Sequence, residues 1–189
     1  YIFNRSSSGS WSQQQKIVAN DRANNDNFGK TVSISGGCIV AGAAQEDEDA
    51  GGTNTFEGAG SAYVFKISAS GTWSQEQKLV NSDRASADLF GTSCAVSGPN
   101  IIIGALFEDE DASGGNTVNL AGSTYIFNRN AVTYSSGSWT GGSGASNEPT
   151  SADTGKSLII SNGSATLTEN VEVANLTVAS GATLTVPAN

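Results

Sequence analysis

Short runs of alternating polar and apolar residues recur along this chain. In residues 31–35, Val32 and Ile34 alternate with small or polar neighbours, which is the period-2 pattern of a half-buried strand. A Gly-Gly turn follows at 36–37, and a second apolar run then ends in Gly-Ala at Ala43. This pattern predicts two strands joined by a tight turn.

A later stretch, residues 88–106, carries the same pattern with Gly98-Pro99-Asn100 as its turn. Its second run, Ile101-Ile102-Ile103, is apolar without alternation. A strand of that kind is typical of a sheet that is covered on both sides. We therefore expect all three isoleucines to be buried.

The two stretches belong to an internal repeat. Tyr1-Ile-Phe, Tyr63-Val-Phe and Tyr125-Ile-Phe begin three copies that are 62 residues apart. Residues 1–62 align with 63–124 without a gap, and roughly half of the aligned positions are identical. The third copy continues only through Tyr125-Ile-Phe-Asn-Arg and Trp139, and no Phe-Gly hairpin follows it.

One repeat contains four strand candidates, at about 30–35, 38–44, 61–68 and 73–80. Four short strands that recur at a fixed period with Gly, Asn and Ser turns are typical of a propeller blade. A stacked β-solenoid is the alternative, although its rungs are usually shorter. The pattern predicts an all-β fold of four-stranded propeller blades.

The order of motifs resembles a known family. Phe-Gly at 28–29, then a hairpin, Gly-Ala at 42–43 and Gly-Ser-Ala-Tyr-Val-Phe at 60–65 resemble the FG-GAP repeat of integrin α-subunit propellers. The Trp-x-x-x-Gln-Lys motif and the Asp-Arg-Ala motif are similar to those of bacterial FG-GAP proteins. The resemblance covers about residues 1–130. It implies a β-propeller on an extracellular protein, often one for adhesion.

One family feature is missing from these repeats. Integrin-type repeats usually carry a calcium loop, Asp-x-Asp-x-Asp-Gly, between Phe-Gly and Gly-Ala. Here that connection is only Ser35-Gly36-Gly37-Cys38 in one repeat and Ser97-Gly98-Pro99-Asn100 in the other. The calcium ligands of the family cannot be transferred to these positions.

The repeat boundaries predict the domain organisation. Residues 1–141 are expected to form an incomplete propeller: 1–18 supply the two outer strands of one blade, 19–80 a complete blade, and 81–141 another that ends near Trp139. Closure takes about four to eight blades. We expect further blades to come from the same, longer protein or from neighbouring subunits.

The remainder of the chain differs in composition. Residues 142–156 form a Gly/Ser-rich linker, and residues 157–189 form a segment of short strands with Asn-Gly and Ser-Gly turns. Ala165-Thr-Leu-Thr recurs at Ala182, 17 residues later. The segment is expected to be the start of a β-helix, with a small β-sandwich as the alternative.

Charge and composition limit the partners. The formal net charge of −9 and the pI of about 4.3 argue against nucleic acid and anionic membrane surfaces, which attract basic proteins. No apolar run approaches the ~20 residues of a membrane-spanning helix. An acidic, Gly- and Ser-rich chain suits a secreted or cell-surface bacterial protein. Cys38 and Cys94 do not occupy equivalent repeat positions, so we expect buried thiols, with a disulfide as the alternative.

The sequence offers little catalytic chemistry. It contains no histidine, which removes Ser-His-Asp and Cys-His arrangements and every His-ligated metal site. Neither cysteine has a second cysteine at metal or redox spacing. We expect a non-enzymatic protein; an active site outside these residues is the alternative.

The candidate binding residues are two acidic runs, each in the loop between Gly-Ala and the next Tyr-x-Phe strand. They are Glu46, Asp47, Glu48 and Asp49, and in the next repeat Glu108, Asp109, Glu110 and Asp111. Ca²⁺ takes six to eight oxygen ligands, which a Gly-rich loop with Asn and Thr can supply. A solvated acidic loop without an ion is the alternative.

The repeated aromatic residues and glycines predict blade contacts. Phe28 and Phe90 are expected to wedge between blades, with Gly29 and Gly91 allowing close backbone approach. Repeated Trp and Tyr residues are more typical of packing between blades than of carbohydrate stacking. We expect an adhesion or binding module whose partner is a protein or glycan at the cell surface or in the matrix. The alternative is a structural subunit of an extracellular filament or fibre.

Overall fold

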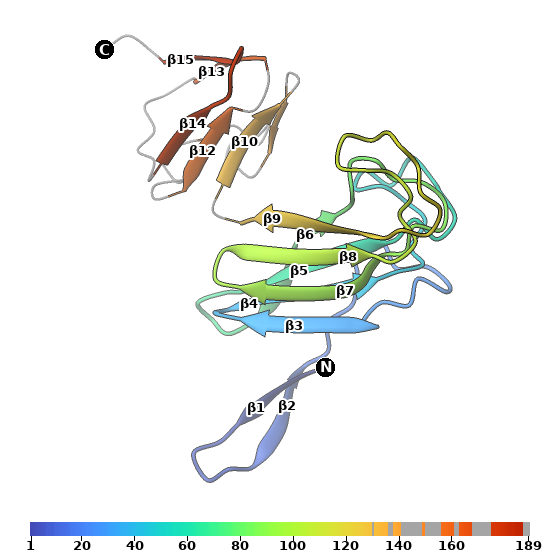
Figure 1. The fold of residues 1–189 in the computed structure, drawn as a ribbon. Coiled ribbons are helices and arrows are strands. Elements are labelled where there is room, and N and C mark those ends of the chain that lie inside the picture. The colour runs from blue at the N-terminus through green and yellow to red at the C-terminus, as the bar shows by residue number, and fades with distance from the viewer. Residues whose placement is uncertain are drawn as a thin grey trace. The chain divides into compact units, whose positions relative to one another are not determined.

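A computed structural model gives the fold of the chain (Figure 1). It describes residues 1–129, 131–135, 138–140, 149, 156–160, 163–167 and 175–186. The chain divides into two compact units, Tyr1–Phe127 and Asn128–Asn189. All regular elements of the described residues are strands, so the all-β prediction is confirmed. No described segment forms a helix long and apolar enough to cross a membrane.

The first unit contains three antiparallel sheets built from nine strands. Their bounds are β1 Ile2–Arg5, β2 Trp11–Gln15, β3 Thr31–Ser35, β4 Cys38–Ala43, β5 Ser61–Ile67, β6 Trp73–Leu79, β7 Phe90–Ser97, β8 Asn100–Ala105 and β9 Ser123–Asn128. β1 and β2 form a hairpin, β3-β4-β5-β6 a four-stranded sheet and β7-β8-β9 a three-stranded sheet. The four strands predicted for one repeat are confirmed, and the set of sheets is not a closed propeller.

Gly36 and Gly37 make the β3–β4 turn possible. Both have positive φ, 52° and 78°, as a two-residue hairpin with the twist of its strands requires. The turn sets the register in which Ile34 pairs with Ile39 and Val32 with Ala41. The sequence pattern and the turn therefore specify the same hairpin.

Each sheet of the repeats has two faces that differ in what covers them. In the β3–β6 sheet we call the face with Ile39, Tyr63 and Phe65 the leading face, and the face with Val40 and Val64 the trailing face. The leading face packs against Ile2 and Ala19 of the preceding segment. The trailing face packs against the leading face of the β7–β9 sheet, and these residues form one core: Cys38, Val40, Ala62, Val64, Leu79, Phe90, Val96, Ile101, Ile103 and Ala105.

Two predicted wedge residues occupy equivalent places. Phe90 is fully buried between the sheets, with its ring 5.5 Å from that of Tyr125 and 6.1 Å from that of Phe127 in edge-to-face geometry. Phe28 lies in the same way against Tyr63, at 5.6 Å. Because only Phe90 has a described sheet on both sides, only Phe90 is completely buried.

Glycines let the two sheets approach to backbone contact. A Cβ atom on Gly42 of β4 would lie 2.0 Å from the carbonyl oxygen of Gly91, and one on Gly91, which has φ +90°, would lie 2.3 Å from that of Ser61. Thr31 Oγ1 also donates to the Gly91 carbonyl, at 3.0 Å. Gly42 of Gly-Ala and Gly91 of Phe-Gly thus meet across the contact between repeats, as predicted for Gly91. The close approach predicted at Gly29 is wrong, because a Cβ atom there would have no atom within 4 Å.

The prediction that all three isoleucines of β8 are buried is wrong at one position. Ile101 and Ile103 are buried, but Ile102 is 44% exposed. Ile102 lies on the trailing face of the β7–β9 sheet, which no described sheet covers. The equivalent strand β4 is buried along its whole length, because it has a neighbour on both sides.

The prediction of a complete second blade over 81–141 is also wrong. The β7–β9 sheet has three strands, and Trp139 lies in β11 (Ser138–Thr140), which pairs with β10 (Ala131–Ser135). β10 pairs in turn with β12 of the second unit. After Trp139 the sequence lacks the Gln-x-Gln-Lys residues that continue β6 after Trp73, so the fourth strand has no counterpart there.

The second unit is built largely from parallel strand pairs. Its other strands are β12 Ser157–Ile160, β13 Ser164–Thr166, β14 Asn175–Val178 and β15 Thr183–Thr185. β10, β12 and β14 are parallel neighbours, as are β13 and β15, around a core of Leu158, Ile160, Ala165 and Leu167. Parallel stacking of short strands favours the β-helix expectation over the β-sandwich. The predicted linker, 142–156, lies outside the described residues except for Pro149 and Lys156.

Neither cysteine forms a disulfide. Cys38 is buried in the core between the two repeats, and Cys94 packs against the same core. Burial raises the pKa of the Cys94 thiol. The expectation of a buried thiol is confirmed for Cys38, whereas Cys94 is only partly buried.

Replacing Gly42 by alanine tests the close contact of the sheets. The Cβ atom would collide with the Gly91 backbone, and we expect Gly42→Ala to lower the free energy of unfolding by about 1–3 kcal/mol. Gly115→Ala is the matched control, because its Cβ would meet nothing closer than 3.9 Å. Denaturant unfolding of both variants measures the difference. Equal stability of the two would contradict the packing described here.

Candidate functional site

Two acidic loops leave the repeats at equivalent places. Residues 44–60 join β4 to β5 and residues 106–122 join β8 to β9, and both loops lie on the same side of the stacked sheets (Figure 1). The predicted site residues fall into two groups within each loop. The aspartates organise the loop itself, and the first glutamate turns inward.

The aspartates of the first loop accept hydrogen bonds from the loop's own backbone. Asp49 Oδ1 accepts from the amides of Gly51, at 2.9 Å, and Thr53, at 3.0 Å, while its Oδ2 accepts from the Asn54 side chain. Asp47 Oδ1 accepts from the Gly58 amide at 2.8 Å. These carboxylates therefore fix the loop conformation.

The second loop repeats the arrangement. Asp111 accepts from the amides of Ser113 and Gly115 and from the Asn116 side chain, and Asp109 accepts from the Leu120 amide. The repetition shows that the two loops share one backbone design. The sequence alone is compatible with an ion site or a solvated loop, and it does not reveal that the carboxylates bond to their own loop.

Glu46 instead lies inside the protein, with 2% of its surface exposed. Its carboxylate accepts from Ser61 Oγ at 2.6 Å and from the Glu48 amide at 3.0 Å. Lys78 Nζ completes the site at 2.7 Å from Glu46 and 2.8 Å from Asp21, over the ring of Tyr63. A buried carboxylate needs such a partner, because burial without one is costly.

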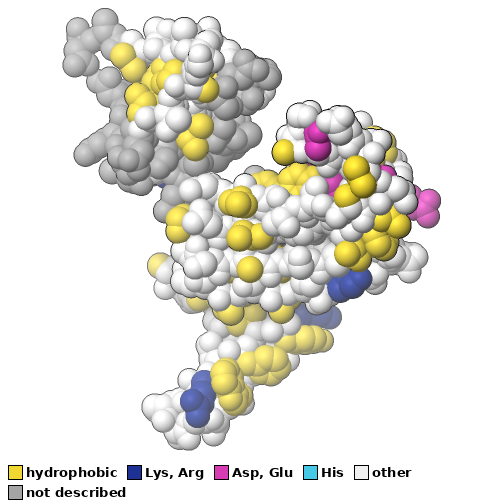
Figure 2. Space-filling view, in the orientation of Figure 1, with side chains coloured by type: hydrophobic (Ala, Val, Ile, Leu, Met, Phe, Trp, Pro, Cys, Tyr) yellow, Lys and Arg dark blue, Asp and Glu magenta, His cyan; other side chains and the backbone are white. Residues whose placement is uncertain are grey.

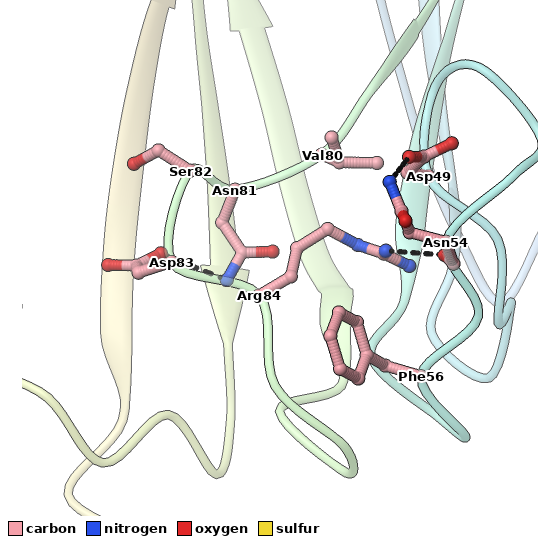
Figure 3. Close-up of a pocket in the computed structure, with 8 residues that line it drawn as sticks. All are labelled: Asp49, Asn54, Phe56, Val80, Asn81, Ser82, Asp83 and Arg84. Atoms are coloured by element: carbon pink, nitrogen blue, oxygen red, sulfur yellow. Dashed lines mark hydrogen bonds between the residues drawn. The ribbon is translucent and has the colours of Figure 1, made fainter.

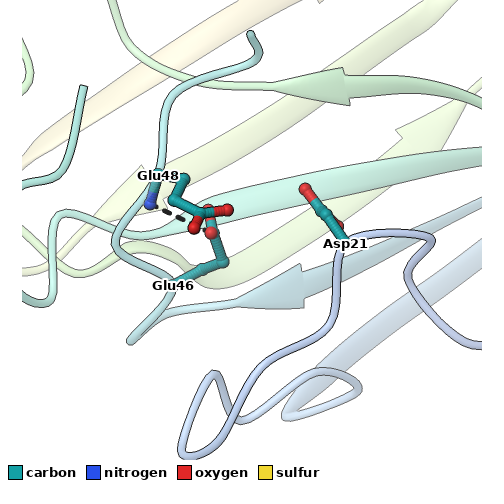
Figure 4. A group of neighbouring side chains, drawn as sticks. All are labelled: Asp21, Glu46 and Glu48. Atoms are coloured by element: carbon teal, nitrogen blue, oxygen red, sulfur yellow. Dashed lines mark hydrogen bonds between the residues drawn. The ribbon is translucent and has the colours of Figure 1, made fainter. Parts of the chain in front are cut away.

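Asp21, Glu46 and Glu48 form a three-carboxylate group whose oxygens lie within 4.8 Å of one another (Figure 4). Within the described ranges this is the group with metal-ligand spacing. Burial acts to raise the pKa of Asp21, but the hydrogen bond and charge of Lys78 hold it below its usual value. The Lys78 ammonium thus already supplies a positive charge to this group.

The second repeat has the carboxylates without the lysine. Glu108 is fully buried and accepts from Tyr125 Oη at 2.8 Å and Asn81 Nδ2 at 3.2 Å. Asn81 also reaches Asp83 and Asp88, at 3.1 and 3.4 Å. No lysine or arginine of the described residues forms an ion pair with this cluster. Burial, together with the charges of Glu108 and Asp83, raises the pKa of Asp88.

A shallow depression lies between the first acidic loop and the segment that leads to β7 (Figure 3). It is lined by Asp49, Asn54, Phe56, Val80, Asn81, Ser82, Asp83 and Arg84. The Arg84 guanidinium donates to the carbonyls of Asp47, at 3.0 Å, and Asn54, at 3.2 Å, and lies 5.8 Å from the centre of the Phe56 ring. The depression combines an aromatic ring with amide, carboxylate and guanidinium groups on a fixed frame.

The acidic runs are evident from the sequence, but the residues that contact them, Lys78 above all, are not. Lys78 lies 32 residues from Glu46, and only the fold brings them together. The repeated Gln-Lys and Asp-Arg motifs were the available signal, since their conservation between copies marks Lys78 and Asp21. Of the predicted residues, Glu46 and Glu48 are brought together, whereas Asp47 and Asp49 bind their own loop.

Removing the Lys78 charge tests the buried ion pair. Lys78→Gln leaves Glu46 buried without a counter-charge, and we expect a loss of about 3–5 kcal/mol in unfolding free energy. Lys66→Gln is the control, because Lys66 forms an exposed pair with Glu76 at 3.8 Å, and a change of at most about 0.5 kcal/mol is expected. If both variants unfold at the same denaturant concentration, the assignment is wrong.

The loop hydrogen bonds also predict a titration. The Thr53 amide and then the Asn54 side chain hold the pKa of Asp49 at about 2, below its usual 3.8. The folded pKa is depressed, so this stabilisation is present above pH 3.8 and is lost as the pH falls towards 2. NMR titration should show the low pKa, and Asn54→Ala should raise it. Asn116→Ala, in the other loop, should leave it unchanged; a normal Asp49 pKa in the unaltered protein would refute the loop geometry.

Comparison with known proteins identifies the repeats. The family model described as FG-GAP repeat matches residues 11–65 and 73–127, which together cover more than half of the chain. No curated protein and no solved structure matches the chain significantly. FG-GAP repeats form β-propeller-like modules that often take part in ligand binding or adhesion, are commonly extracellular and are typically not enzymes. The chain belongs to the FG-GAP repeat family.

Proposed function

We propose that this chain is a non-enzymatic binding or adhesion module of a secreted or cell-surface protein, and that its ligand is a protein or glycan of the cell surface or matrix. The observation that carries the proposal is the depression beside the first acidic loop (Figure 3). Phe56 is 42% exposed there, next to the amide of Asn54 and the guanidinium of Arg84. An exposed aromatic ring beside fixed polar groups suits sugar rings and peptide side chains.

The rigidity of the surrounding loop supports this function. Asp47 and Asp49 hold the loop through backbone hydrogen bonds, and Arg84 ties it to the segment before β7. A surface that is already ordered loses little conformational entropy when a ligand binds. Loops on a rigid β scaffold are a common place for recognition.

The sequence supports binding without catalysis. The chain has no histidine, and its two cysteines are both packed into the same apolar core. The acidic net charge of −9 favours protein or glycan partners over nucleic acid. The absence of basic clusters likewise gives no support to binding of anionic membranes.

A structural subunit of an extracellular filament or fibre is the second candidate. It is favoured by apolar side chains that stay exposed on the outer faces of the repeats, such as Val32, Ile34 and Ile126. Exposed apolar patches of this kind are typical of association surfaces. Arrays of glycans and matrix proteins separate the candidates, because a binding module should have a ligand there whether or not copies associate, whereas a purely structural subunit should have none.

Calcium at the acidic loops is part of the proposal. In a single copy the second loop is the better candidate, since Lys78 already neutralises Glu46 and Asp21 in the first. Calorimetric titration with CaCl₂ should release or absorb heat, and Glu110→Gln should weaken binding more than Glu48→Gln does. No heat and no rise in melting temperature would remove calcium from the proposal.

Ligand binding can be tested at Phe56. Arrays of glycans and matrix proteins probed with the protein should reveal a ligand, and Phe56→Ala should reduce its affinity at least tenfold. Phe107→Ala is the matched control, because Phe107 is similarly exposed, at 38%, but lies in the second loop. Binding that is lost equally in both variants, or no binding on any array, would contradict the proposal.

A further inference from the structure

Apolar residues are exposed at both outer faces of the repeats. On the leading face of β3, Val32 and Ile34 are 67% and 63% exposed. On the trailing face of the β7–β9 sheet, Ile102 and Ile126 are 44% and 72% exposed. Figure 2 shows hydrophobic side chains over that sheet and along the β1–β2 hairpin. No described sheet covers the trailing face of the β7–β9 sheet. On the leading face of the β3–β6 sheet, the β1–β2 hairpin packs through Ile2 but leaves Val32 and Ile34 exposed.

The contact between the β3–β6 and β7–β9 sheets shows which surfaces the two exposed faces can pack against. Positions 62 residues apart are equivalent in the two repeats. Ile102 and Ile126 are thus the equivalents of Val40 and Val64. Likewise, Val32 and Ile34 are the equivalents of Cys94 and Val96. Val40 and Val64 pack with Val96 and Cys94 in the core between the sheets. The trailing face of one copy is therefore shaped to receive the leading face of β3 in a second copy.

The strands β1 and β9 carry the same sequence. Residues 1–5 and 125–129 are both Tyr-Ile-Phe-Asn-Arg. In β1 the isoleucine, Ile2, is 8% exposed against the leading face of the β3–β6 sheet, whereas in β9 the same residue, Ile126, is 72% exposed. If β9 of a second copy took the place of β1, its Ile126 would be buried against the leading face of the β3–β6 sheet, where Ile2 lies in one copy.

β2 pairs with β1 as the outer strand β6 pairs with β5, and among the described residues β9 has no such outer strand beside it. β2 pairs with β1 in the register of β6 with β5: Ile2 pairs with Gln15 as Val64 pairs with Gln77, and both pairs are followed by a bulge. In the described part of the chain, no strand pairs with the outer edge of β9. Because residues 1–5 and 125–129 are identical, β2 can pair with β9 as it pairs with β1.

Charge complementarity points to the same partner. Lys16 follows β2 and lies 5.8 Å from the Tyr1 ring centre, as Lys78 lies 5.7 Å from that of Tyr63. Lys16 is exposed and has no ion pair with any described residue. Glu108 and Asp83 are the repeat equivalents of Glu46 and Asp21, and no described lysine pairs with them. Paired with β9, β2 would place Lys16 where Lys78 lies in the first repeat.

We propose that copies of this chain associate head to tail by strand exchange. β2 of one copy pairs with β9 of another in place of β1, which brings Lys16 to Glu108 and Asp83. Val32 and Ile34 of the first copy then cover Ile102 of the second. The contact joins two different surfaces of the chain. A pair of copies therefore leaves one surface of each kind unoccupied, and further copies can bind there to form a ring or a filament.

Sedimentation velocity of the full chain between about 5 and 500 µM tests the exchange. We expect the mass to rise with concentration from the 19.2 kDa of one chain to that of several. Ile126→Ser and Lys16→Gln should each weaken association at least tenfold. Both side chains are exposed in one copy, so neither change should impair folding, which circular dichroism verifies.

Two matched controls accompany these variants. Val118→Ser removes an apolar side chain that is 63% exposed in the second acidic loop, and Lys66→Gln removes an exposed lysine of β5. Both should associate like the unaltered chain. A constant mass of one chain at every concentration, or association that Ile126→Ser and Lys16→Gln leave unchanged, overturns the proposal. A strictly monomeric chain would leave the ligand-binding proposal intact, since the depression belongs to one copy.

Discussion

The close contact between the trailing face of one repeat and the leading face of the next is the constraint on which the structure depends. Gly42 and Gly91 allow backbones of the two sheets to touch, and Phe90 fills the space beside them. Burial of an aliphatic or aromatic side chain contributes about 1.5–3 kcal/mol, so the ten-residue core supplies much of the stability of this unit. The Phe-Gly and Gly-Ala motifs that define the repeat are the residues of this contact.

The contact also places the polar groups. The segment before β7 must cross from one sheet to the next, and it carries Asn81, Asp83 and Arg84 past the first acidic loop. The loop in turn is fixed by aspartates that bond to its own amides. The first repeat neutralises its buried glutamate with Lys78, whereas the described part of the second repeat has no lysine at Glu108. Two repeats that share the same acidic run therefore differ in electrostatics because their outer strands differ.

The strands could be predicted from the sequence to within a residue or two, because turns such as Gly36-Gly37 and the 62-residue period mark their ends. The burial of individual side chains is harder to predict than the positions of the strands. Ile102 resembles Val40 in its strand, and only the presence or absence of a neighbouring sheet decides their exposure. The local motif predicts that Trp139 belongs to the second repeat, but its strand pairs with β10.

The acidic residues of the loops are evident from the sequence, but their contacts in the fold are not. Four consecutive acidic residues look alike in sequence, yet Glu46 is buried at an ion pair while Asp49 closes a loop. These differences arise from backbone amides and from Lys78, which the fold brings near. Neither of the two alternatives compatible with the sequence, an ion site and a solvated loop, includes hydrogen bonds from the backbone amides of a loop to its own carboxylates.

The central claim is that the two repeats lie face to face with Val40 and Val64 of one against Val96 and Ile103 of the next. Methyl NOE spectroscopy on selectively labelled protein tests it most directly. We expect cross-peaks that connect the Val40 and Val64 methyl groups with those of Val96 and Ile103, and none that connect them with the exposed Ile126. Cross-peaks from Val40 to Ile126, or none between the two repeats, would contradict it.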